Sequence, residues 1–276
     1  MRLFDKVAIV GTGLIGGSIA LAIKRKGLAN EVIGVSRHKQ TLSKALQNRA
    51  IDKGSTNINV IRGADLVILA TPVRAVLNLA PLVRKITNPD CIVTDVASTK
   101  QEIAAKLGKI FPNYIGSHPL AGSERRGIIN ADAGLFKDSL CILTPAQNTD
   151  KKNLSRIKKF WACLGARVIN LSPAEHDKIL SLVSHLTHIA AFSLINSVPR
   201  KYLRFASSGL KGTTRIAASD SGLWSDIFLS NQKNMLVSIS SFQKNISKIK
   251  SAIQRKDRKV LTLILREAAA KRELLG

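Results

Sequence analysis

The chain has 276 residues, is 45% apolar and contains 3 cysteines without a CxxC pair. This composition predicts a folded protein of a reducing compartment, the cytoplasm, and excludes a disulfide framework or a low-complexity chain. The net charge of +25 raises nucleic acid or an anionic membrane as a partner, but the excess is even: 26 basic and 11 acidic residues in 1–171, and 17 and 7 in 172–276. Because no aromatics interleave the basic clusters for base stacking, we expect no nucleic-acid partner but a surface that attracts small anions.

The first predicted elements lie in residues 7–23, a stretch with no charged side chain. A membrane span needs about 20 mainly apolar residues, and the four glycines of this stretch would weaken a lone membrane helix. A signal peptide fits no better, because the basic n-region is weak and no A-x-A cleavage site follows. We therefore expect no membrane anchor here, but a buried strand over 7–10 and a helix over 14–26 that ends at Gly27.

A glycine-rich loop joins this strand to this helix. Its sequence is a G-x-G-x-x-G fingerprint in the strand, turn and helix context that dinucleotide binding requires. The first glycine permits the tight turn, the second lets a pyrophosphate approach the backbone, and the third lets the helix pack on the strand. The helix N-terminus adds partial positive charge. We expect the whole loop to contact a dinucleotide, the alternative being a glycine turn that binds nothing: Gly11, Thr12, Gly13, Leu14, Ile15 and Gly16.

The end of the next expected strand, at 31–35, indicates which dinucleotide is preferred. An acidic residue there would hold the ribose 2′-hydroxyl of NAD. The sequence instead has Ser36 and Arg37, followed by a histidine and a lysine. A hydroxyl beside a guanidinium suits a 2′-phosphate, so NADP is favoured over NAD, the alternative being a solvated basic loop.

The remaining pattern predicts the fold class and two domains. Apolar runs with helical segments between most of them predict strands at 66–70, 91–94, 114–116, 141–144 and 166–171. This alternation is typical of an α/β Rossmann fold with a doubly wound parallel sheet. After residue 171 a capping box and a first-turn proline open a helical region without a convincing strand. We predict a dinucleotide-binding domain over 1–171 and an all-helical domain over 172–276, which is small and apolar enough to seek a partner.

Polar residues that follow strands are candidates for binding, because ligands of such sheets lie at the carboxyl ends of the strands. We assign Thr71 and Asp95 to the cofactor on this basis. Ser98 lies in the same loop as Asp95, and a plain helix cap is an equal alternative for either residue.

Histidines supply the remaining chemistry. His118, fixed between a serine and a proline at a strand end, is a poor core histidine and a good general base. In the long helix after residue 172, His185 and His188 share a face beside Ser184. A metal site would need His118 or His176 as a further ligand and lacks the carboxylate of an HExxH motif, so we expect no metal. One of the paired histidines could instead be structural.

These residues lie in motifs through which the chain resembles the prephenate and arogenate dehydrogenase family of tyrosine biosynthesis. The motifs occur in family order from about residue 7 to residue 234: GTGLIGGS, TDVASTK, GSHPLAGSERRG, HDKILSLVSHLTH and SSGLKGTTRIAASDSGLW. The chain looks like a stand-alone form without a fused mutase or regulatory module. Thr187 and Ser208 depart from residues common in relatives, which affects the expected shape of the side-chain pocket.

The resemblance implies an oxidative decarboxylation. Hydride passes from the hydroxyl-bearing carbon of a cyclohexadienol to NAD(P)⁺ while CO₂ leaves, so the enzyme mainly needs positioning and one proton acceptor. By similarity His118 accepts the proton of the 4-hydroxyl, and Ser98 lies between that hydroxyl and the nicotinamide. Arg215 binds a substrate carboxylate through its planar fork. The resemblance places His176 behind the site and gives the rest of the substrate lining as Ser123, Glu124, Ser184, His185 and His188.

The resemblance also implies a homodimer of helical domains, in which Arg215 reaches the neighbouring site, and tyrosine as an inhibitor. The loop at Ser36 with VTDVAS and ASSG looks most like NADP-dependent arogenate dehydrogenases, so we expect arogenate and NADP, the alternative being an NAD-dependent prephenate dehydrogenase. Two remoter alternatives are another two-domain hydroxyacid dehydrogenase, whose linker lysine is absent around 165–185, and an NADP-sensing DNA-binding regulator, which has no need of His118, Ser98 and Arg215 together.

Overall fold

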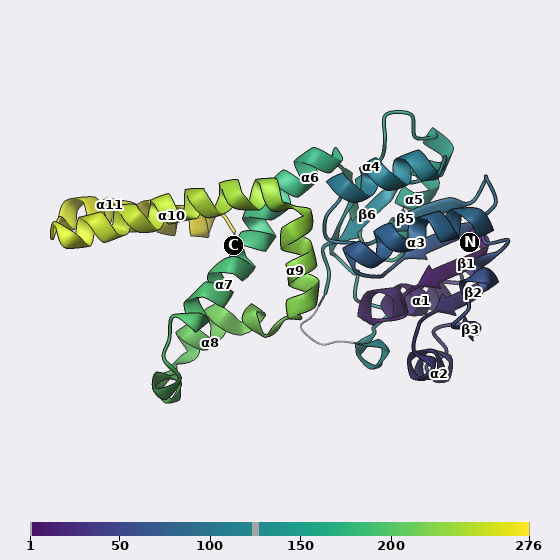
Figure 1. Cartoon of the computed structure of the whole chain (residues 1–276), viewed down its shortest axis with the longest axis horizontal. Helices are drawn as coiled ribbons and strands as arrows, with labels where there is room; N and C mark the ends of the chain where they lie inside the picture. The colour runs from purple at the N-terminus through teal and green to yellow at the C-terminus, as the bar shows by residue number, and fades with distance from the viewer. Residues whose placement is uncertain (1, 123–126, 276) are drawn as a thin grey trace.

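A computed structural model describes residues 2–122 and 127–275 of the chain. An α/β body carries the N-terminus, and a slender helical part extends from it toward the C-terminal helices (Figure 1). The two parts meet near residue 172, where the last strand gives way to helix. The predicted fold class, a Rossmann-type sheet followed by an all-helical region, is confirmed, while the predicted boundary at 171 stays a prediction.

A parallel sheet forms the centre of the α/β body. In the described part of the chain it has five strands in the order β3-β2-β1-β4-β5, and each neighbouring pair is parallel. The central strands are short apolar runs buried on both faces, which is the pattern of a parallel sheet covered by helices. The strands span β1 Phe4–Val10, β2 Ala29–Val35, β3 Lys53–Ser55, β4 Leu66–Leu69 and β5 Ile92–Asp95.

Helices cover both faces of this sheet, and the alternation of side chains along β1 shows how. Val7 and Ile9 belong to a core with α1 and α2, whereas Ala8 and Val10 point to the opposite core with α3 and α4. Successive residues of a strand face opposite sides, so one strand supplies both cores. The four helices are α1 Leu14–Lys26, α2 Lys39–Gln47, α3 Val73–Ile86 and α4 Gln101–Ile110.

A second sheet departs from the expected all-parallel arrangement. Its strands are β6 Gly116–Pro119, β7 Leu140–Thr144 and β8 Arg167–Asn170, and β6 runs antiparallel to β7. The strand expected at 114–116 therefore begins two residues later and contains His118, while Tyr114 makes only an isolated bridge to Val93 of β5. Helix α5 Lys151–Cys163 packs its Phe160 and Trp161 into the core under β7.

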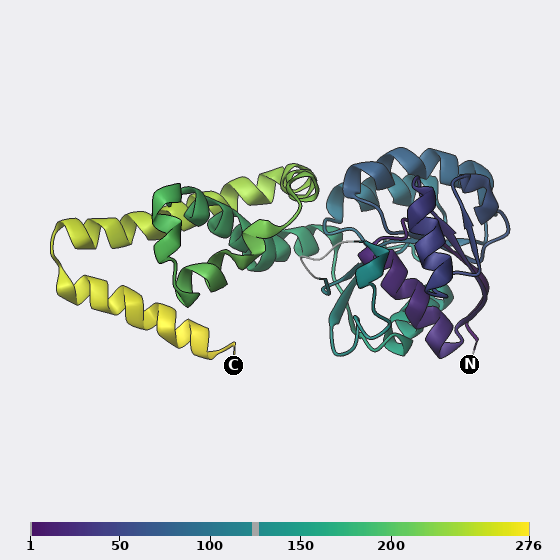
Figure 2. The ribbon, with the colours of Figure 1, turned by 90° about the horizontal axis from the view of Figure 1, so that it is seen from below.

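The region after residue 172 is helical, and its described residues contain no strand. Ser172 and Glu175 form the predicted capping box at the start of α6. The chain then passes through a single π-helical turn, η3, into α7. Of the two long helices at the end of the chain, α10 runs away from the sheet, and α11 turns back from its far end (Figure 2). The elements are α6 Pro173–Leu180, η3 Ser181–His185, α7 Leu186–Asn196, α8 Ser208–Thr214, α9 Ser221–Ser230, α10 Gln232–Gln254 and α11 Arg258–Glu273. Short 3₁₀ turns complete the chain as η1 Ile58–Ile61, η2 Ile128–Asn130, η4 Arg200–Phe205 and η5 Arg215–Ala218.

The helical run Pro173–Asn196 is long and apolar enough to cross a membrane by length and composition, and only 22% of its most apolar window is buried. That criterion is weak by itself, because core helices of folded proteins also meet it. Asp177 and His185 within this run are buried and hydrogen-bonded to other parts of the protein. We therefore treat the run as part of the folded helical domain.

The helical part exposes large apolar side chains. Val237 and Leu236 on α10 are 71% and 59% exposed, and Leu263 and Leu265 on α11 are 58% and 55% exposed. Several large exposed apolar side chains on neighbouring helices are typical of a surface that another protein covers.

Candidate functional site

A cleft of about 970 Å³ separates the α/β body from the helical part. Its floor comes from the carboxyl ends of β1, β4 and β5 and from β6, and its opposite wall comes from η3, α7, η5 and α9. This is where an open α/β sheet binds its ligands. Of the residues predicted to act, this cleft brings together Gly13, Leu14, Ile15, Thr71, Ser98, His118, Ser184, His185, His188 and Arg215.

The glycine-rich loop has the geometry of a phosphate cradle. Gly11 has φ +101°, and a Cβ there would lie 2.4 Å from the carbonyl oxygen of Ala70. A Cβ on Gly16 would lie 1.9 Å from the carbonyl oxygen of Gly11, so α1 and β1 approach too closely for any side chain. Beside Gly13, by contrast, a Cβ would meet nothing within 4 Å. The open space over Gly13 is where the backbone can approach a pyrophosphate.

Two further observations support a dinucleotide at this end of the cleft. Helix α1 has no side-chain cap on its first backbone N–H groups and no acid in its first turn, so these donors are available to phosphate oxygens. The hydroxyls of Thr12 and Thr71 are buried without a hydrogen-bond partner among the described residues. Buried hydroxyls are normally satisfied, and Thr71 lines the cleft, so its hydroxyl can take a polar ligand there. The residues present therefore fit a dinucleotide cofactor.

Ser36 and Arg37 follow β2 at the rim of the α/β body. Arg37 is exposed, and Ser36 is partly exposed and accepts a hydrogen bond from the backbone of His38 at 3.3 Å. Neither residue lines the cleft itself. Their position at the end of the second strand is where a ribose is held in this fold.

Asp95 does not lie where we expected it. Its carboxylate is fully buried, forms an ion pair with the buried Lys100, accepts a hydrogen bond from Tyr114 at 2.6 Å, and accepts one from the backbone of Ala97 at 2.9 Å. Burial, with the negative charge of Asp95, raises the pKa of Tyr114. These internal partners occupy both oxygens, so the structure replaces the expected cofactor contact of Asp95 with a structural role.

His118 lies within β6 and faces the cleft, with 8% of its surface exposed. Its Nδ1 lies 2.8 Å from Nε2 of His176, which is fully buried on α6. Burial lowers the pKa of His118 well below 6.5, and the nearby His176, Lys100 and His185 lower it further. His118 is therefore neutral at pH 7, which is the form that can accept a proton.

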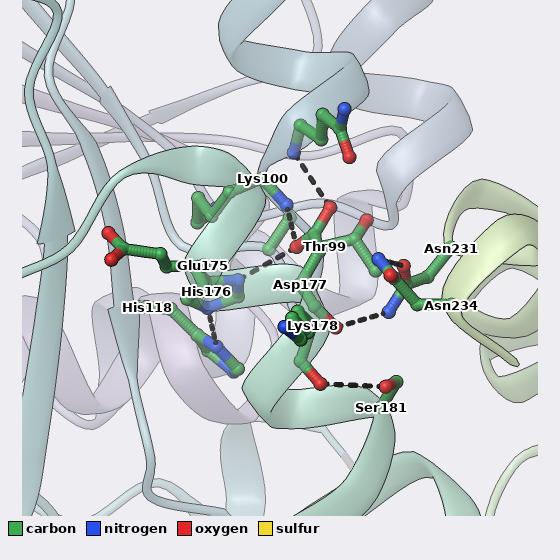
Figure 3. A network of polar contacts seen from close by, with 12 residues as sticks. Thr99, Lys100, His118, Glu175, His176, Asp177, Lys178, Ser181, Asn231 and Asn234 are labelled. Atoms are coloured by element: carbon green, nitrogen blue, oxygen red, sulfur yellow. Dashed lines mark hydrogen bonds and ion pairs between the residues drawn. The ribbon is translucent and has the colours of Figure 1, made fainter. Parts of the chain in front are cut away.

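A carboxylate that we did not predict completes this arrangement (Figure 3). The other ring nitrogen of His176, Nδ1, lies 2.8 Å from Oδ1 of Asp177. Asp177 is fully buried and also receives the backbone N–H groups of Lys100 and Gln101 at 2.7 and 2.8 Å. Asp177 lies inside the HDKILSLVSHLTH motif, but the motif did not indicate this role, because the partners of Asp177 at the N-terminus of α4 lie more than 70 residues away.

The opposite wall of the cleft carries the other expected histidines. His188 is half-buried and stacks on Trp224, with ring centroids 3.4 Å apart and planes 23° apart. Burial lowers the pKa of His188, and the charge of Arg215 lowers it further against the opposing effect of a Ser184 backbone contact. Trp224 was not among our candidates, although an aromatic in the cleft is the usual partner of a flat ligand ring.

His185 is buried and has one ring nitrogen without a partner. Its Nδ1 lies 3.3 Å from Nδ2 of Asn231, an amide donor, so Nδ1 accepts and Nε2 carries the proton. No partner for Nε2 exists among the described residues. Burial lowers the pKa of His185 to about 4, so this histidine presents a neutral N–H donor. A structural histidine would have both nitrogens satisfied, and His185 does not.

Ser123 and Glu124 lie outside the described residues. Within residues 2–122 and 127–275, no group of three histidine, cysteine, aspartate or glutamate side chains could hold a metal ion.

Comparisons with known proteins agree with this geometry. Two family models match: the nucleotide-binding domain of prephenate dehydrogenase over residues 19–170 and the dimerization domain of prephenate dehydrogenase over residues 172–267. A prephenate dehydrogenase of Bacillus subtilis is 34% identical over 92% of this chain and 71% of its own.

Two solved structures have the same architecture. A prephenate dehydrogenase from Aquifex aeolicus, in complex with hydroxyphenyl propionate and NAD⁺, has a TM-score of 0.94 and 34% identity, covering 99% of this chain and 98% of its own. An arogenate dehydrogenase from Synechocystis has a TM-score of 0.84 and 28% identity, covering 98% of this chain and 100% of its own.

Proposed function

The chain belongs to the prephenate dehydrogenase family of NAD(P)-dependent oxidoreductases, and from that premise we propose that it oxidatively decarboxylates arogenate with NADP⁺ as the hydride acceptor. Dehydrogenation of prephenate or arogenate is the activity of the family, and the remoter alternatives of a hydroxyacid dehydrogenase or a DNA-binding regulator fall away. The choice of arogenate and NADP⁺ is our own. The observation that carries the proposal is a neutral, buried His118 that faces the cleft beside a glycine loop fitted to a dinucleotide.

The cofactor, when bound, supplies a hydride acceptor. The residues of this chain then have to bind and orient the substrate and take one proton. In our proposal Arg215, which lines the cleft, binds a substrate carboxylate as a planar fork. Ser98, on the floor of the same cleft, orients the 4-hydroxyl. The imidazole of His118 accepts the proton of that hydroxyl as hydride leaves, and it returns the proton to the phenolate oxygen that forms when CO₂ departs, so His118 is neutral again at the end.

The stacked pair of His188 and Trp224 and the N–H donor of His185 occupy the wall of the cleft that faces His118. We assign them, with Ser184, to the ring and side chain of the substrate. An apolar indole face suits the cyclohexadienol ring, and a neutral N–H suits a carbonyl or carboxylate oxygen. Protonation of His118 during turnover leaves these histidines neutral, because burial lowers the pKa of each.

The cofactor preference rests on Ser36 and Arg37, which offer a hydroxyl and a guanidinium at the end of β2 where NAD-dependent folds have an acid. The second candidate is an NAD-dependent prephenate dehydrogenase, favoured by the Aquifex aeolicus structure with its NAD⁺. The preference for arogenate rests on the local sequence similarity. The structural similarity to the Synechocystis arogenate dehydrogenase agrees with it.

Steady-state kinetics with the four pairs of substrate and cofactor test the proposal. We expect kcat/KM to be highest for arogenate with NADP⁺, and a swap of Arg37→Ser to reduce the NADP⁺ advantage without reducing turnover with NAD⁺. An order in which prephenate with NAD⁺ comes first would select the second candidate. Absence of turnover with all four pairs would contradict both.

We propose further that the molecule works in the cytoplasm as a homodimer through its helical part, where the dimerization-domain match coincides with the exposed apolar faces of α10 and α11. In that dimer Arg215 would reach the neighbouring site. Tyrosine, which is the product of the proposed reaction on arogenate, is expected to compete with the substrate for the same cleft.

A further inference from the structure

We propose that Asp177 is a positioning residue: through His176 it fixes the proton of His118 on Nδ1, so that Nε2 keeps its lone pair for the substrate. This inference rests on the proposed role of His118 as the proton acceptor and adds the device that makes it one. The contacts of two buried side chains, His176 and Asp177, carry it.

Asp177 can be an acceptor only. Its carboxylate lies at the N-terminus of α4, where the backbone N–H groups of Lys100 and Gln101 donate to Oδ1 and Oδ2 at 2.7 and 2.8 Å. Backbone N–H groups cannot accept, and a helix N-terminus favours negative charge, so the carboxylate is ionised there. An ionised carboxylate has no proton to donate.

The position of the proton on each of the two imidazole rings, His176 and His118, is therefore fixed. Nδ1 of His176 must donate to Oδ1 of Asp177 across 2.8 Å, because Asp177 only accepts. A neutral imidazole with its proton on Nδ1 accepts at Nε2. Nε2 of His176 lies 2.8 Å from Nδ1 of His118, which consequently donates. The proton of His118 is then on Nδ1, and its Nε2 is the acceptor.

Neutrality of both rings is required for this order, and the surroundings supply it. Burial is the main cause that lowers the pKa of His176, and the charge of Lys100 lowers it as well, against the raising effects of Asp177 and Asp95. The groups around His118 come from three elements: Lys100 before α4, His176 on α6 and His185 in η3. Among the described residues none of the groups that shift the pKa of His118 is an acid, and burial keeps His118 neutral until it takes a proton.

The same order helps the reaction after the proton has moved. An imidazolium on His118 would donate from Nδ1 to His176 as before, with the charge of Asp177 at the far end of the chain of hydrogen bonds. A buried ion of this kind is costly without a compensating charge, and Asp177 provides one. The helix cap of α4 holds Asp177 in place during this step.

The substitution Asp177→Asn tests the inference because it inverts the order with little change of shape. Asparagine is itself a good N-cap, so its oxygen can retain a backbone N–H of α4. With its oxygen at the position of Oδ2, where the N–H of Gln101 donates, its amide group takes the position of Oδ1 and gives up the N–H of Lys100. The amide would then donate to Nδ1 of His176, which moves the His176 proton to Nε2 and the His118 proton to Nε2. We expect kcat to fall about 100-fold or more, in line with the usual contribution of a general base, while the Kd of NADP⁺ changes by less than about threefold.

Two controls separate positioning from general damage. Ser230→Ala removes another hydrogen bond between the two parts of the molecule, the 2.9 Å contact with Thr99, and leaves the histidines untouched. We expect it to keep kcat within about twofold. The tautomer of His118 can be read directly from the ¹⁵N spectrum of its ring, which is tractable because the chain has only 5 histidines.

The outcomes are distinct. A lone pair on Nε2 of His118 in the wild type and on Nδ1 in Asp177→Asn, together with the fall in kcat, supports the inference. An unchanged tautomer, or an unchanged kcat, in Asp177→Asn overturns it. Should that variant fail to fold, His176→Gln and His176→Leu replace it: glutamine can accept from His118 and should retain at least tenfold more activity than leucine, and equal losses overturn the inference. Turnover that persists in His118→Asn contradicts the proposed function instead, whatever the tautomers show.

Discussion

The imidazole of His188 lies flat against the indole of Trp224, with ring centroids 3.4 Å apart. The pair lines the cleft on the wall opposite His118. An aromatic stack of this kind excludes water from one face of each ring and leaves the other face for a flat ligand.

The stack makes Trp224 a reporter of the charge on His188. An imidazolium in contact with an indole quenches its fluorescence, and burial lowers the pKa of His188. We expect the emission of the protein to fall in acid with a midpoint below 6.5, the ordinary value. The change should vanish in His188→Gln, whereas the fully buried Trp161, which donates to Ser117 at 3.1 Å, provides a constant background. A midpoint at or above 6.5 would contradict the burial of His188.

Gly13 and Gly16 separate cofactor binding from folding. Alanine at Gly16 would place its Cβ 1.9 Å from the carbonyl oxygen of Gly11, so we expect Gly16→Ala to cost about 1–3 kcal/mol and to lower Tm by several degrees. Alanine at Gly13 meets nothing within 4 Å in the protein. Gly13→Ala should keep Tm within about a degree and weaken NADP⁺ at least tenfold, which calorimetry measures. Equal affinities in Gly13→Ala and wild type would show that no phosphate approaches this backbone.

His185 should make the protein less stable in acid. Its pKa is about 4 in the folded chain and near 6.5 when unfolded, so the unfolded state binds more protons between these values and stability falls as pH decreases through that window. Between pH 7.5 and pH 5 the titration of His185 lowers the free energy of unfolding by about 2 kcal/mol. Urea unfolding gives the free energy of unfolding of wild type and His185→Gln at the two pH values. The loss of stability between pH 7.5 and pH 5 should be larger in the wild type, and the difference between the two losses measures the contribution of His185. Equal losses of stability in the two proteins would mean that the His185 ring can take up a proton in the folded state.

His118→Asn should abolish turnover. Asparagine matches the size of the imidazole near the cleft and cannot accept a proton at pH 7, so we expect a fall in kcat of at least about 100-fold. The glycine loop is unchanged by this substitution, and the Kd of NADP⁺ should stay within about threefold. Turnover close to wild type would place the proton acceptor elsewhere.

Arg215→Lys should lower kcat/KM for the substrate and leave the affinity for the cofactor unchanged. Lysine keeps the charge but loses the planar fork, and a hydrogen bond to a charged group contributes about 1.5–3 kcal/mol, so kcat/KM for the substrate should fall about 10-fold to 100-fold. Arg200→Lys, at an exposed arginine of η4, is the matched control and should leave kcat/KM unchanged. An equal response of the two variants would remove Arg215 from the binding site.

Local chemistry decided how much of the fold could be predicted. The helix at 14–26 was predicted to its last residue because Gly27, in the left-handed conformation, ends it by a purely local rule. The strand around His118 was placed two residues early because Gly116, Ser117 and Pro119 have low strand propensity. Its backbone is held by β7, some 25 residues further along the chain, and no local pattern reports such a partner.

The candidate site divides in the same way. Motifs and strand ends identified ten cleft residues and His176, but they could not distinguish Asp95, whose side chain pairs with the buried Lys100, from a cofactor contact. Asp177 and Trp224 lie inside two of the quoted motifs, HDKILSLVSHLTH and SSGLKGTTRIAASDSGLW, but the motifs by themselves do not assign a role to either residue. Their importance arises from contacts with segments distant in the sequence: Asp177 contacts the N-terminus of α4 across the two parts of the molecule, and Trp224 of α9 contacts His188 of α7 within the helical part.

The cap that Asp177 places on α4 spans the junction between the two halves of the molecule. A thermal fluctuation that pulls α6 away from α4 would therefore also release the imidazole that takes the proton. In such an open form His118 would lack the contact with His176 that orients its proton. The contact between α6 and α4 and the orientation of His118 are thus coupled. A ligand that separated α6 from α4 would inhibit the reaction without contacting His118.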